Sequence, residues 1–161
     1  MIYDALRDMG ILEERTTETA EVISLMTRAE RDLATGKLLQ DKDEEWAFAA
    51  SYQAMSRSAR ALIMSEGFRP KGGRSRDMQK TIVTATGVIL GDQYKSLINK
   101  FDRMRRKYQN FMEEAGRVIS RYEAGQAIRD GEEFLALVNG RIREKYSQMS
   151  LLNDVTQSAS R

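Results

Sequence analysis

The sequence lacks cysteine and histidine altogether, over a length of 161 residues. Without cysteine, the chain has neither a disulfide bond nor a thiol nucleophile. Without histidine, it lacks the side chain that most often serves as a metal ligand or as a general base near neutral pH. No pair of carboxylates has a spacing typical of metal ligands. We therefore expect no metal site, no cofactor and no serine hydrolase triad.

Long hydrophobic runs and a strong excess of one charge are missing as well. No stretch approaches the length of a membrane span, and the segment "MIYDALRDMGILEER" does not resemble a targeting sequence. The 26 basic and 24 acidic residues leave a formal charge of only +2. Any affinity for nucleic acid must therefore come from a local patch. These features predict one globular domain in the cytoplasm, without membrane contact.

Proline is scarce, and the glycines fall mostly where a helix could end. The single proline is Pro70, a composition that favours long helices. Apolar residues recur at spacings of three and four, which predicts a short helix within residues 2–12 and long amphipathic helices after it. The residues expected to open these long helices are Thr17, Asp43, Ser75, Asp92 and Ser120. No strand and no internal repeat is expected.

Short loops between long amphipathic helices make sequential helices pack side by side. The sequence therefore predicts an all-α fold, an antiparallel up-and-down bundle of four or five long helices. Residues 1–16 are expected to form a short N-terminal helix and linker, and residues 17–146 the bundle. Residues 147–161, rich in serine, threonine, glutamine and asparagine, are expected to form a flexible tail.

The segment "FDRMRRKYQNFMEE", residues 101–114, combines the strongest apolar periodicity with many charges. The apolar seam between Tyr94 and Ala115 either fills the core of the chain or forms a dimer interface, and the first interpretation is favoured. Arg105 falls inside the apolar face of this helix. A guanidinium group there must reach water, pair with a carboxylate or line a cleft.

Four polar residues adjoin Arg105 on the predicted helix: Asp102, Arg106, Gln109 and Glu113. They indicate either intrahelical pairs at the edge of the core or one side of a functional cleft. Composition and periodicity leave both interpretations open.

Several segments in a characteristic order resemble the HEPN superfamily over roughly residues 22–142. They are "AERDL", an alanine- and aromatic-rich second helix, "GFRPKGG" and "MRRK". The resemblance implies a helical bundle, commonly a homodimer, from a prokaryotic toxin–antitoxin or other defence system, often encoded beside a nucleotidyltransferase. Active members are metal-independent ribonucleases that use an arginine followed, a few residues later on the same helix, by a histidine.

The sequence departs from this ribonuclease motif. Arg105, or less securely Arg106, matches the arginine, but the place of the histidine falls among residues 110–113, "NFME". Glu113 is the candidate replacement, although a carboxylate beside arginines is a poor base.

The segment "RPKGGRSR" is a second candidate for phosphate binding. It gathers Arg69, Lys71 and Arg74 around flexible glycines, just ahead of a helix N-terminus. A solvated basic loop without a ligand is the alternative interpretation.

Three functional hypotheses follow. The leading one is a non-catalytic, RNA- or nucleotide-associated HEPN-like module of a toxin–antitoxin or defence system, with a nucleotidyltransferase-type antitoxin as a candidate partner. In it, Arg105 and Arg106 contact phosphate, while Asp102, Gln109 and Glu113 shape the cleft. The first alternative is a metal-independent ribonuclease toxin that uses Arg105 with Glu113. The second is a protein-interaction scaffold that does not bind nucleic acid.

Overall fold

The computed structural model describes residues 2–71, 75–113 and 119–159. Within these ranges the chain forms six α-helices, one 3-10 helix and two short strands. In chain order they are α1 (Ile2–Asp8), β1 (Leu12–Glu14), α2 (Thr19–Leu39), α3 (Glu44–Ser65), β2 (Phe68–Pro70), α4 (Ser75–Leu90), η1 (Asp92–Tyr94), α5 (Lys95–Glu113) and α6 (Arg121–Ala159). The predicted all-α bundle is confirmed.

The boundaries of the long helices follow local chemistry. Asp43 caps α3, since its carboxylate accepts a hydrogen bond from the Trp46 backbone N–H at 3.1 Å. Ser120 and Glu123 form a reciprocal capping box at the start of α6, each side chain accepting a hydrogen bond from the backbone N–H of the other. The predicted cap at Thr17 is wrong, because Glu18 precedes α2 and makes no side-chain cap hydrogen bond.

The expectation that the chain has no strand is also wrong. β1 and β2 form an antiparallel ribbon in which Leu12 is opposite Pro70, Glu13 opposite Arg69 and Glu14 opposite Phe68. Three residues per strand are too few to show the alternation that identifies a strand in sequence. Leu12 and Phe68 are buried, so packing against the helices holds the ribbon in place.

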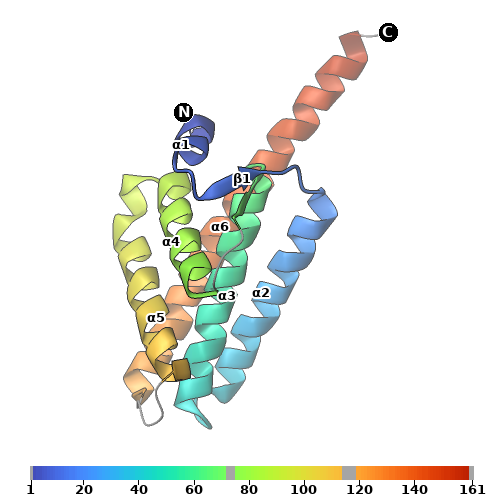
Figure 1. The fold of residues 1–161 in the computed structure, drawn as a ribbon. Helices are drawn as coiled ribbons and strands as arrows, with labels where there is room; N and C mark the ends of the chain where they lie inside the picture. The colour runs from blue at the N-terminus through green and yellow to red at the C-terminus, as the bar shows by residue number, and fades with distance from the viewer. Residues whose placement is uncertain (1, 72–74, 114–118, 160–161) are drawn as a thin grey trace.

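Helix α3 forms the centre of the bundle, and α2, α4, α5 and α6 all pack against it (Figure 1). The core contains the fully buried aromatic residues Tyr52, Phe101 and Phe134, whose rings form a contiguous series with centroid separations of 6.0 and 5.0 Å. Leu97 and Met104 are buried in the same core. The described part of the α5 seam therefore packs inside the chain, as the favoured interpretation predicted; Ala115 lies outside the described residues.

Two glycines permit the close approach of α2 to its neighbours. A Cβ atom at Gly36 would lie 2.9 Å from Ser51 Oγ and 3.1 Å from the Ala47 carbonyl oxygen on α3. A Cβ atom at Gly131 on α6 would lie 2.9 Å from Leu33 Cδ1. Gly131 therefore allows tight packing of α6 against α2, besides lowering the helix propensity of its segment.

Helix α6 continues to Ala159, so residues 147–159 of the predicted tail are helical, and Figure 1 shows this end projecting from the bundle. Only side chains before residue 149 are described on it. The division into a short N-terminal helix and linker (residues 1–16), a bundle (residues 17–146) and a tail (residues 147–161) stays a prediction. None of the described helices is long and apolar enough to cross a membrane.

Candidate nucleic-acid interface on helix α5

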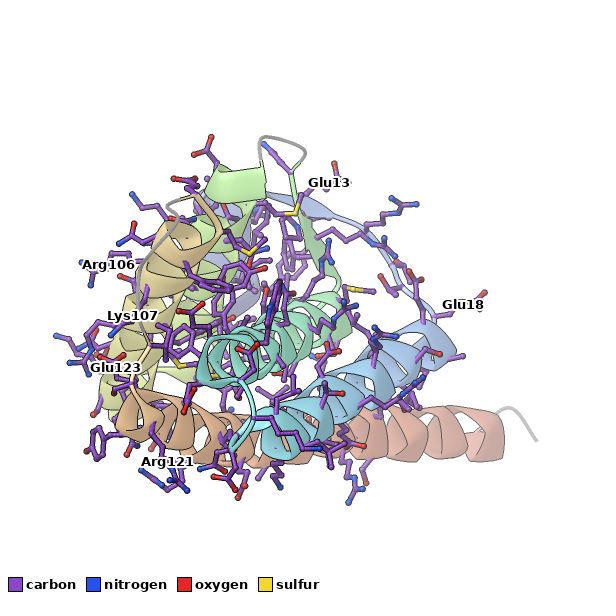
Figure 2. All side chains as sticks on the ribbon, turned by 90° about the horizontal axis from the view of Figure 1, so that it is seen from below. Glu13, Glu18, Arg106, Lys107, Arg121 and Glu123 are labelled. Atoms are coloured by element: carbon purple, nitrogen blue, oxygen red, sulfur yellow. The ribbon has the colours of Figure 1, made fainter. Side chains whose placement is uncertain are left out.

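Helix α5 concentrates positive charge. It carries six basic and two acidic residues, for a net charge of +4, whereas the whole chain carries +2. The rest of the chain is therefore net negative, at −2. Figure 2 shows Arg106 at the outer side of the bundle, exposed to solvent, and the half-buried Lys107 close to Glu123. Of the six basic residues, Arg105 is buried, and Lys100 and Lys107 pair with Asp130 and Glu123 on α6. The exposed positive charge of α5 therefore consists of Lys95, Arg103 and Arg106.

The outer face of α5 has a shallow groove. Its volume is about 590 Å³ and it is lined by Lys95, Ser96, Asn99, Asp102, Arg103 and Arg106. The Arg106 side chain is 63% exposed, and Arg103 forms no ion pair with any described residue. Three cations against one carboxylate give the lining of this groove a surplus of two positive charges, a composition that suits an anion.

A second groove lies between α5 and α6. It has a volume of about 470 Å³, and Arg103 and Lys107 lie on its α5 wall with Tyr122 on its α6 wall. Lys107 Nζ pairs with Glu123 at 2.6 Å, so part of its charge is balanced. Tyr122 is strongly exposed and offers a ring on which a base can stack. Arg103 lines both grooves and joins them.

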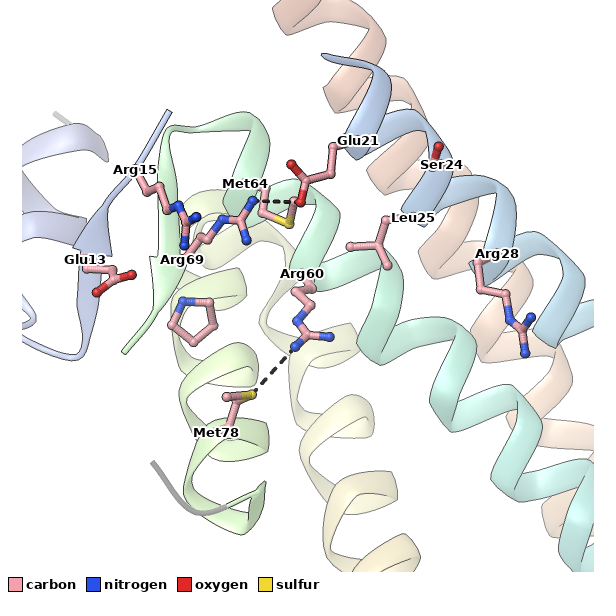
Figure 3. Close-up of a pocket in the computed structure, with 11 residues that line it drawn as sticks. Glu13, Arg15, Glu21, Ser24, Leu25, Arg28, Arg60, Met64, Arg69 and Met78 are labelled. Carbon is pink, nitrogen blue, oxygen red and sulfur yellow. Dashed lines mark hydrogen bonds and ion pairs between the residues drawn. The ribbon is translucent and has the colours of Figure 1, made fainter. Parts of the chain in front are cut away.

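The second predicted phosphate-binding segment, with Arg69, Lys71 and Arg74 near Pro70, does not belong to the grooves of α5. Arg69 is on β2 and lines a cavity whose walls come from the ribbon and from α2, α3 and α4 (Figure 3). Lys71 follows β2 and is exposed. Arg74 lies outside the described residues. The structure therefore assigns Arg69 to a cavity that no α5 residue lines, and phosphate binding by these three residues stays a prediction.

Arg105 is buried at the edge of the core, with only 9% of its surface exposed. Its Nε donates to Asp102 Oδ1 at 2.9 Å, and its Nη1 donates to Gln109 Oε1 at 3.4 Å. The other oxygen of Asp102 lies 3.5 Å from Arg106 Nε. Asp102 thus joins one buried and one exposed arginine on the same helix. Asp102, Arg106 and Gln109, three of the four residues predicted to adjoin Arg105, thus form intrahelical contacts around it.

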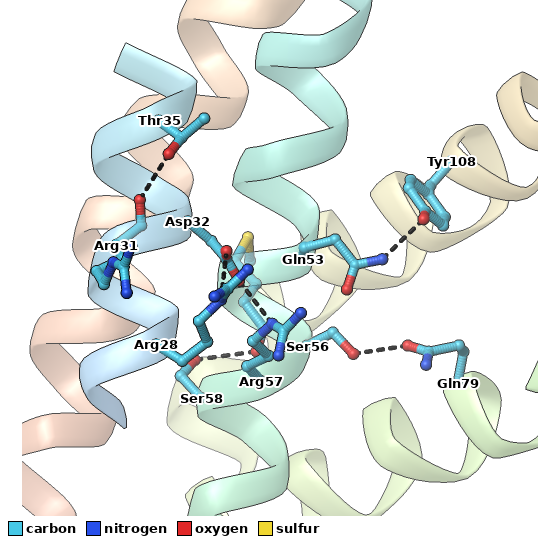
Figure 4. A network of polar contacts seen from close by, with 11 residues as sticks. Arg28, Arg31, Asp32, Thr35, Gln53, Ser56, Arg57, Ser58, Gln79 and Tyr108 are labelled. Atoms are coloured by element: carbon cyan, nitrogen blue, oxygen red, sulfur yellow. Dashed lines mark hydrogen bonds and ion pairs between the residues drawn. The ribbon is translucent and has the colours of Figure 1, made fainter. Parts of the chain in front are cut away.

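A hydrogen-bonded network lies next to Arg105, between α3, α4 and α5. The Tyr52 and Ser56 hydroxyls both donate to Gln79 Oε1, at 2.8 and 2.7 Å, and Gln53 Nε2 donates to the Tyr108 hydroxyl at 2.7 Å. Figure 4 shows the contacts of Ser56 and Gln53. The Tyr52 and Tyr108 rings are 4.5 Å apart. The network ties α5 and the start of α4 to the central helix.

Burial raises the pKa of the Tyr52 phenol far above its usual value, and the positive charge of Arg105 opposes this shift. The phenol is therefore a neutral hydrogen-bond donor at neutral pH. The sequence correctly predicts Tyr52 as a core residue but does not single out its partners. Ser56, one helical turn after Tyr52 on an otherwise apolar face, is the signal that indicates a polar contact there.

Glu113 is the exposed last residue of α5. It follows Arg105 by eight residues, which places the two backbones about 12 Å apart along the helix axis. The carboxylate that the Arg105 guanidinium contacts is that of Asp102. No group of three acidic residues that could hold a metal ion occurs in the described part of the chain.

A protein-family model described as the HEPN domain matches residues 22–142. The chain belongs to the HEPN family. The match runs from the first turn of α2 into α6 and includes the whole of α5, which confirms the resemblance. No curated protein matches the chain. HEPN domains often form dimers, and this HEPN chain carries the arginines of α5 without any histidine.

Proposed function

We propose that this HEPN chain is a non-catalytic RNA-binding module of a prokaryotic toxin–antitoxin or defence system. It acts in the cytoplasm as a homodimer, with a nucleotidyltransferase-type antitoxin as its candidate partner. The observation that supports the proposal is the net charge of +4 on α5 in a chain that is otherwise net negative. RNA phosphates bind along the exposed face of this helix, and the negative remainder of the chain limits contact elsewhere.

In this proposal the arginines of α5 have different roles. Arg103 and Arg106 contact phosphate, because both line the outer groove and Arg106 is exposed. Arg105 is a positioning residue, since its guanidinium group is buried and holds Asp102. Asp102 in turn orients Arg106 through its second oxygen. Gln109 accepts a hydrogen bond from Arg105 Nη1 and so helps to hold the buried guanidinium group in place.

The proposed module binds RNA without cleaving it. Metal-independent cleavage needs a group that takes a proton from the 2′-hydroxyl near neutral pH, and the chain has no histidine for this task. Glu113 is exposed at the end of the helix, eight residues after Arg105, and the carboxylate that contacts the Arg105 guanidinium is that of Asp102. A ribonuclease that uses Arg105 with Glu113 is the competing proposal.

Fluorescence anisotropy with a labelled single-stranded RNA tests the binding site. The double variant Arg103→Ala/Arg106→Ala should bind at least about tenfold more weakly than the wild type at low salt, since each phosphate contact is a charge-assisted hydrogen bond. It should also lower the slope of log Kd against log salt by about 1.4, at about 0.7 per phosphate lost from a single strand.

Arg31→Ala is the matched control, because Arg31 is an exposed arginine in the middle of α2. It should leave both affinity and slope unchanged. Equal losses in the double variant and in Arg31→Ala would show diffuse attraction, and the α5 site would be wrong. Absence of binding by the wild type would favour a scaffold that binds proteins alone.

A further inference from the structure

Two ion pairs cross the groove between α5 and α6. Lys107 Nζ lies 2.6 Å from Glu123 Oε1, and Lys100 Nζ lies 3.6 Å from Asp130 Oδ1. All four residues line the groove, and Figure 2 shows Lys107 and Glu123 close together. The two lysines are seven residues apart on α5, and the two acids are seven residues apart on α6. The two pairs therefore lie about two helical turns apart along an antiparallel pair of helices.

The position midway between these pairs has a cation on one side and no carboxylate on the other. Arg103 lies there on α5, and Gln126 and Ala127 lie there on α6. The Gln126 amide donates to Asp130 at 2.9 Å, within its own helix. Arg103 forms no ion pair with any residue that the structure describes. Arg103 thus lacks the counter-charge that both neighbouring lysines of α5 have.

The floor of this groove is apolar. Phe48 on α3, Met104 on α5 and Ala127 on α6 line it, and all three are buried. An apolar surface lowers the local dielectric constant, so a charge beside it attracts a counter-ion more strongly than a charge in open water does. The middle of the groove therefore favours an anion at Arg103.

Tyr122 lies at one end of the same groove, in the first turn of α6. It is 75% exposed, and its ring contacts no other aromatic ring of the described residues. It precedes Ala127 by five residues, which places it about 7.5 Å along the helix axis from the middle of the groove. A base and a neighbouring phosphate of one extended strand can span this distance.

We propose that Tyr122 is a specificity-determining residue of the RNA-binding face. Its ring stacks on one unpaired base, and a neighbouring phosphate of the same strand pairs with Arg103 above the apolar floor of the groove. This inference rests on the proposed RNA-binding function, and it adds the α5–α6 groove and a residue of α6 to the site on α5. Arg103 connects the two parts of the site, because it lines both grooves.

Stacking on Tyr122 distinguishes a single strand from a duplex. In a duplex each base is paired and covered by its neighbours, so a side chain reaches its face only after the base is unstacked. In a single strand the faces are accessible, and an aromatic side chain can stack on any base. Phosphates are present in both forms. The site should therefore bind both forms through Arg103 and Arg106, and prefer the single strand because of Tyr122.

Fluorescence anisotropy of the full chain with one short labelled RNA, either single-stranded or annealed to its complement, tests this role. The wild type should bind the single strand more tightly than the duplex. Tyr122→Ala should weaken single-strand binding about 5- to 100-fold, the effect of losing one base–aromatic stack. It should leave duplex binding and the salt slope unchanged, since it removes no phosphate contact. Tyr122→Phe keeps the ring and should bind like the wild type.

Glu123→Gln is an independent test, because it should strengthen binding. Glutamine can still accept the hydrogen bond from the Ser120 backbone N–H at the start of α6. It no longer balances the charge of Lys107. The released lysine should add one phosphate contact, which raises both the affinity for the single strand and the slope of log Kd against log salt, the latter by about 0.7.

Three results would overturn the role of Tyr122. They are wild-type affinity of Tyr122→Ala for the single strand, an equal loss of duplex binding in that variant, and unchanged single-strand binding in Glu123→Gln. If Arg103→Ala/Arg106→Ala loses affinity while Tyr122→Ala does not, the RNA-binding face on α5 stands and the inference about Tyr122 is wrong. If the wild type binds neither form of RNA, the proposed function fails, and this inference fails with it.

Discussion

The Nε atom of Arg105 lies 2.9 Å from Oδ1 of Asp102, one helical turn earlier on α5. The arginine side chain is 10% exposed and the aspartate side chain 35% exposed, so the cation is the more buried partner. Removal of Asp102 and removal of Arg105 should therefore change the free energy of unfolding by different amounts. A buried charge that loses its partner is costly, whereas a solvated one is not.

Asp102→Asn should lower the free energy of unfolding by about 1.5–3 kcal/mol, because it leaves the buried Arg105 guanidinium without a counter-charge. Arg105→Met should cost about 1 kcal/mol or less, because Met fills similar space and Asp102 keeps water and Arg106 as partners. Urea unfolding of the two variants measures both changes. Equal losses, or a larger loss for Arg105→Met, would contradict the asymmetry of the pair.

The buried phenol of Tyr52 should make stability fall at alkaline pH. Its pKa is raised by burial, so above about pH 10 the unfolded chain releases this proton while the folded chain retains it. The contribution of Tyr52 is therefore fully present below pH 10 and declines above it, by up to about 1.4 kcal/mol per pH unit. At pH 8 the Tyr52→Phe variant should be less stable than the wild type. Between pH 10 and 11 its free energy of unfolding should fall by less than that of the wild type.

Tyr122→Phe is the control for that experiment, because Tyr122 is 75% exposed. Its unfolding free energy should follow the wild-type pH dependence. If the free energy of unfolding of Tyr52→Phe declined above pH 10 as steeply as that of the wild type, groups other than Tyr52 would cause the alkaline loss of stability.

Two glycine substitutions should change stability in opposite directions. Alanine is the better helix former by about 1 kcal/mol, but at Gly36 its Cβ would contact Ser51 Oγ at 2.9 Å. That hydroxyl is held by its hydrogen bond to the Ala47 carbonyl, so we expect Gly36→Ala to cost about 1–3 kcal/mol. Gly140 faces open space on α6, so Gly140→Ala should stabilise by about 0.5–1 kcal/mol. Thermal unfolding of the two variants measures both changes. If Gly36→Ala stabilised the chain, the close contact of α2 with α3 at this position would be wrong.

The single tryptophan reports on the end of α5. Trp46 is 52% exposed, and its ring meets that of Phe111 edge-on at 5.4 Å. Phe111→Ala should therefore expose Trp46 further and shift its fluorescence emission to longer wavelength, at a cost of about 0.5–1.5 kcal/mol for the aromatic pair. Tyr122→Phe should leave the emission maximum unchanged. An unchanged spectrum in Phe111→Ala would mean that the two rings are not in contact in solution.

Periodicity and capping chemistry made the helices predictable, whereas the sites depend on contacts between distant segments. Asp43 is predictable as a cap from the residues that adjoin it, and Arg105 is predictable as a cation on an apolar face. The pocket around Arg69 could not be found in this way, because Arg15 and Arg60 are brought to it only by the ribbon and by α3. The ribbon itself is not predictable from the sequence, because its strands have only three residues each.

The most direct test of the central claim is incubation of the purified wild-type chain with labelled total RNA in excess chelator, followed by native and denaturing gels. Arg103→Ala/Arg106→Ala and Arg31→Ala are run beside it. We predict that the wild type and Arg31→Ala shift the RNA on the native gel, that the double variant does not, and that the RNA on the denaturing gel stays intact. Cleavage by the wild type that the Arg105→Ala or Glu113→Gln variant abolishes would contradict the account and identify the chain as a ribonuclease.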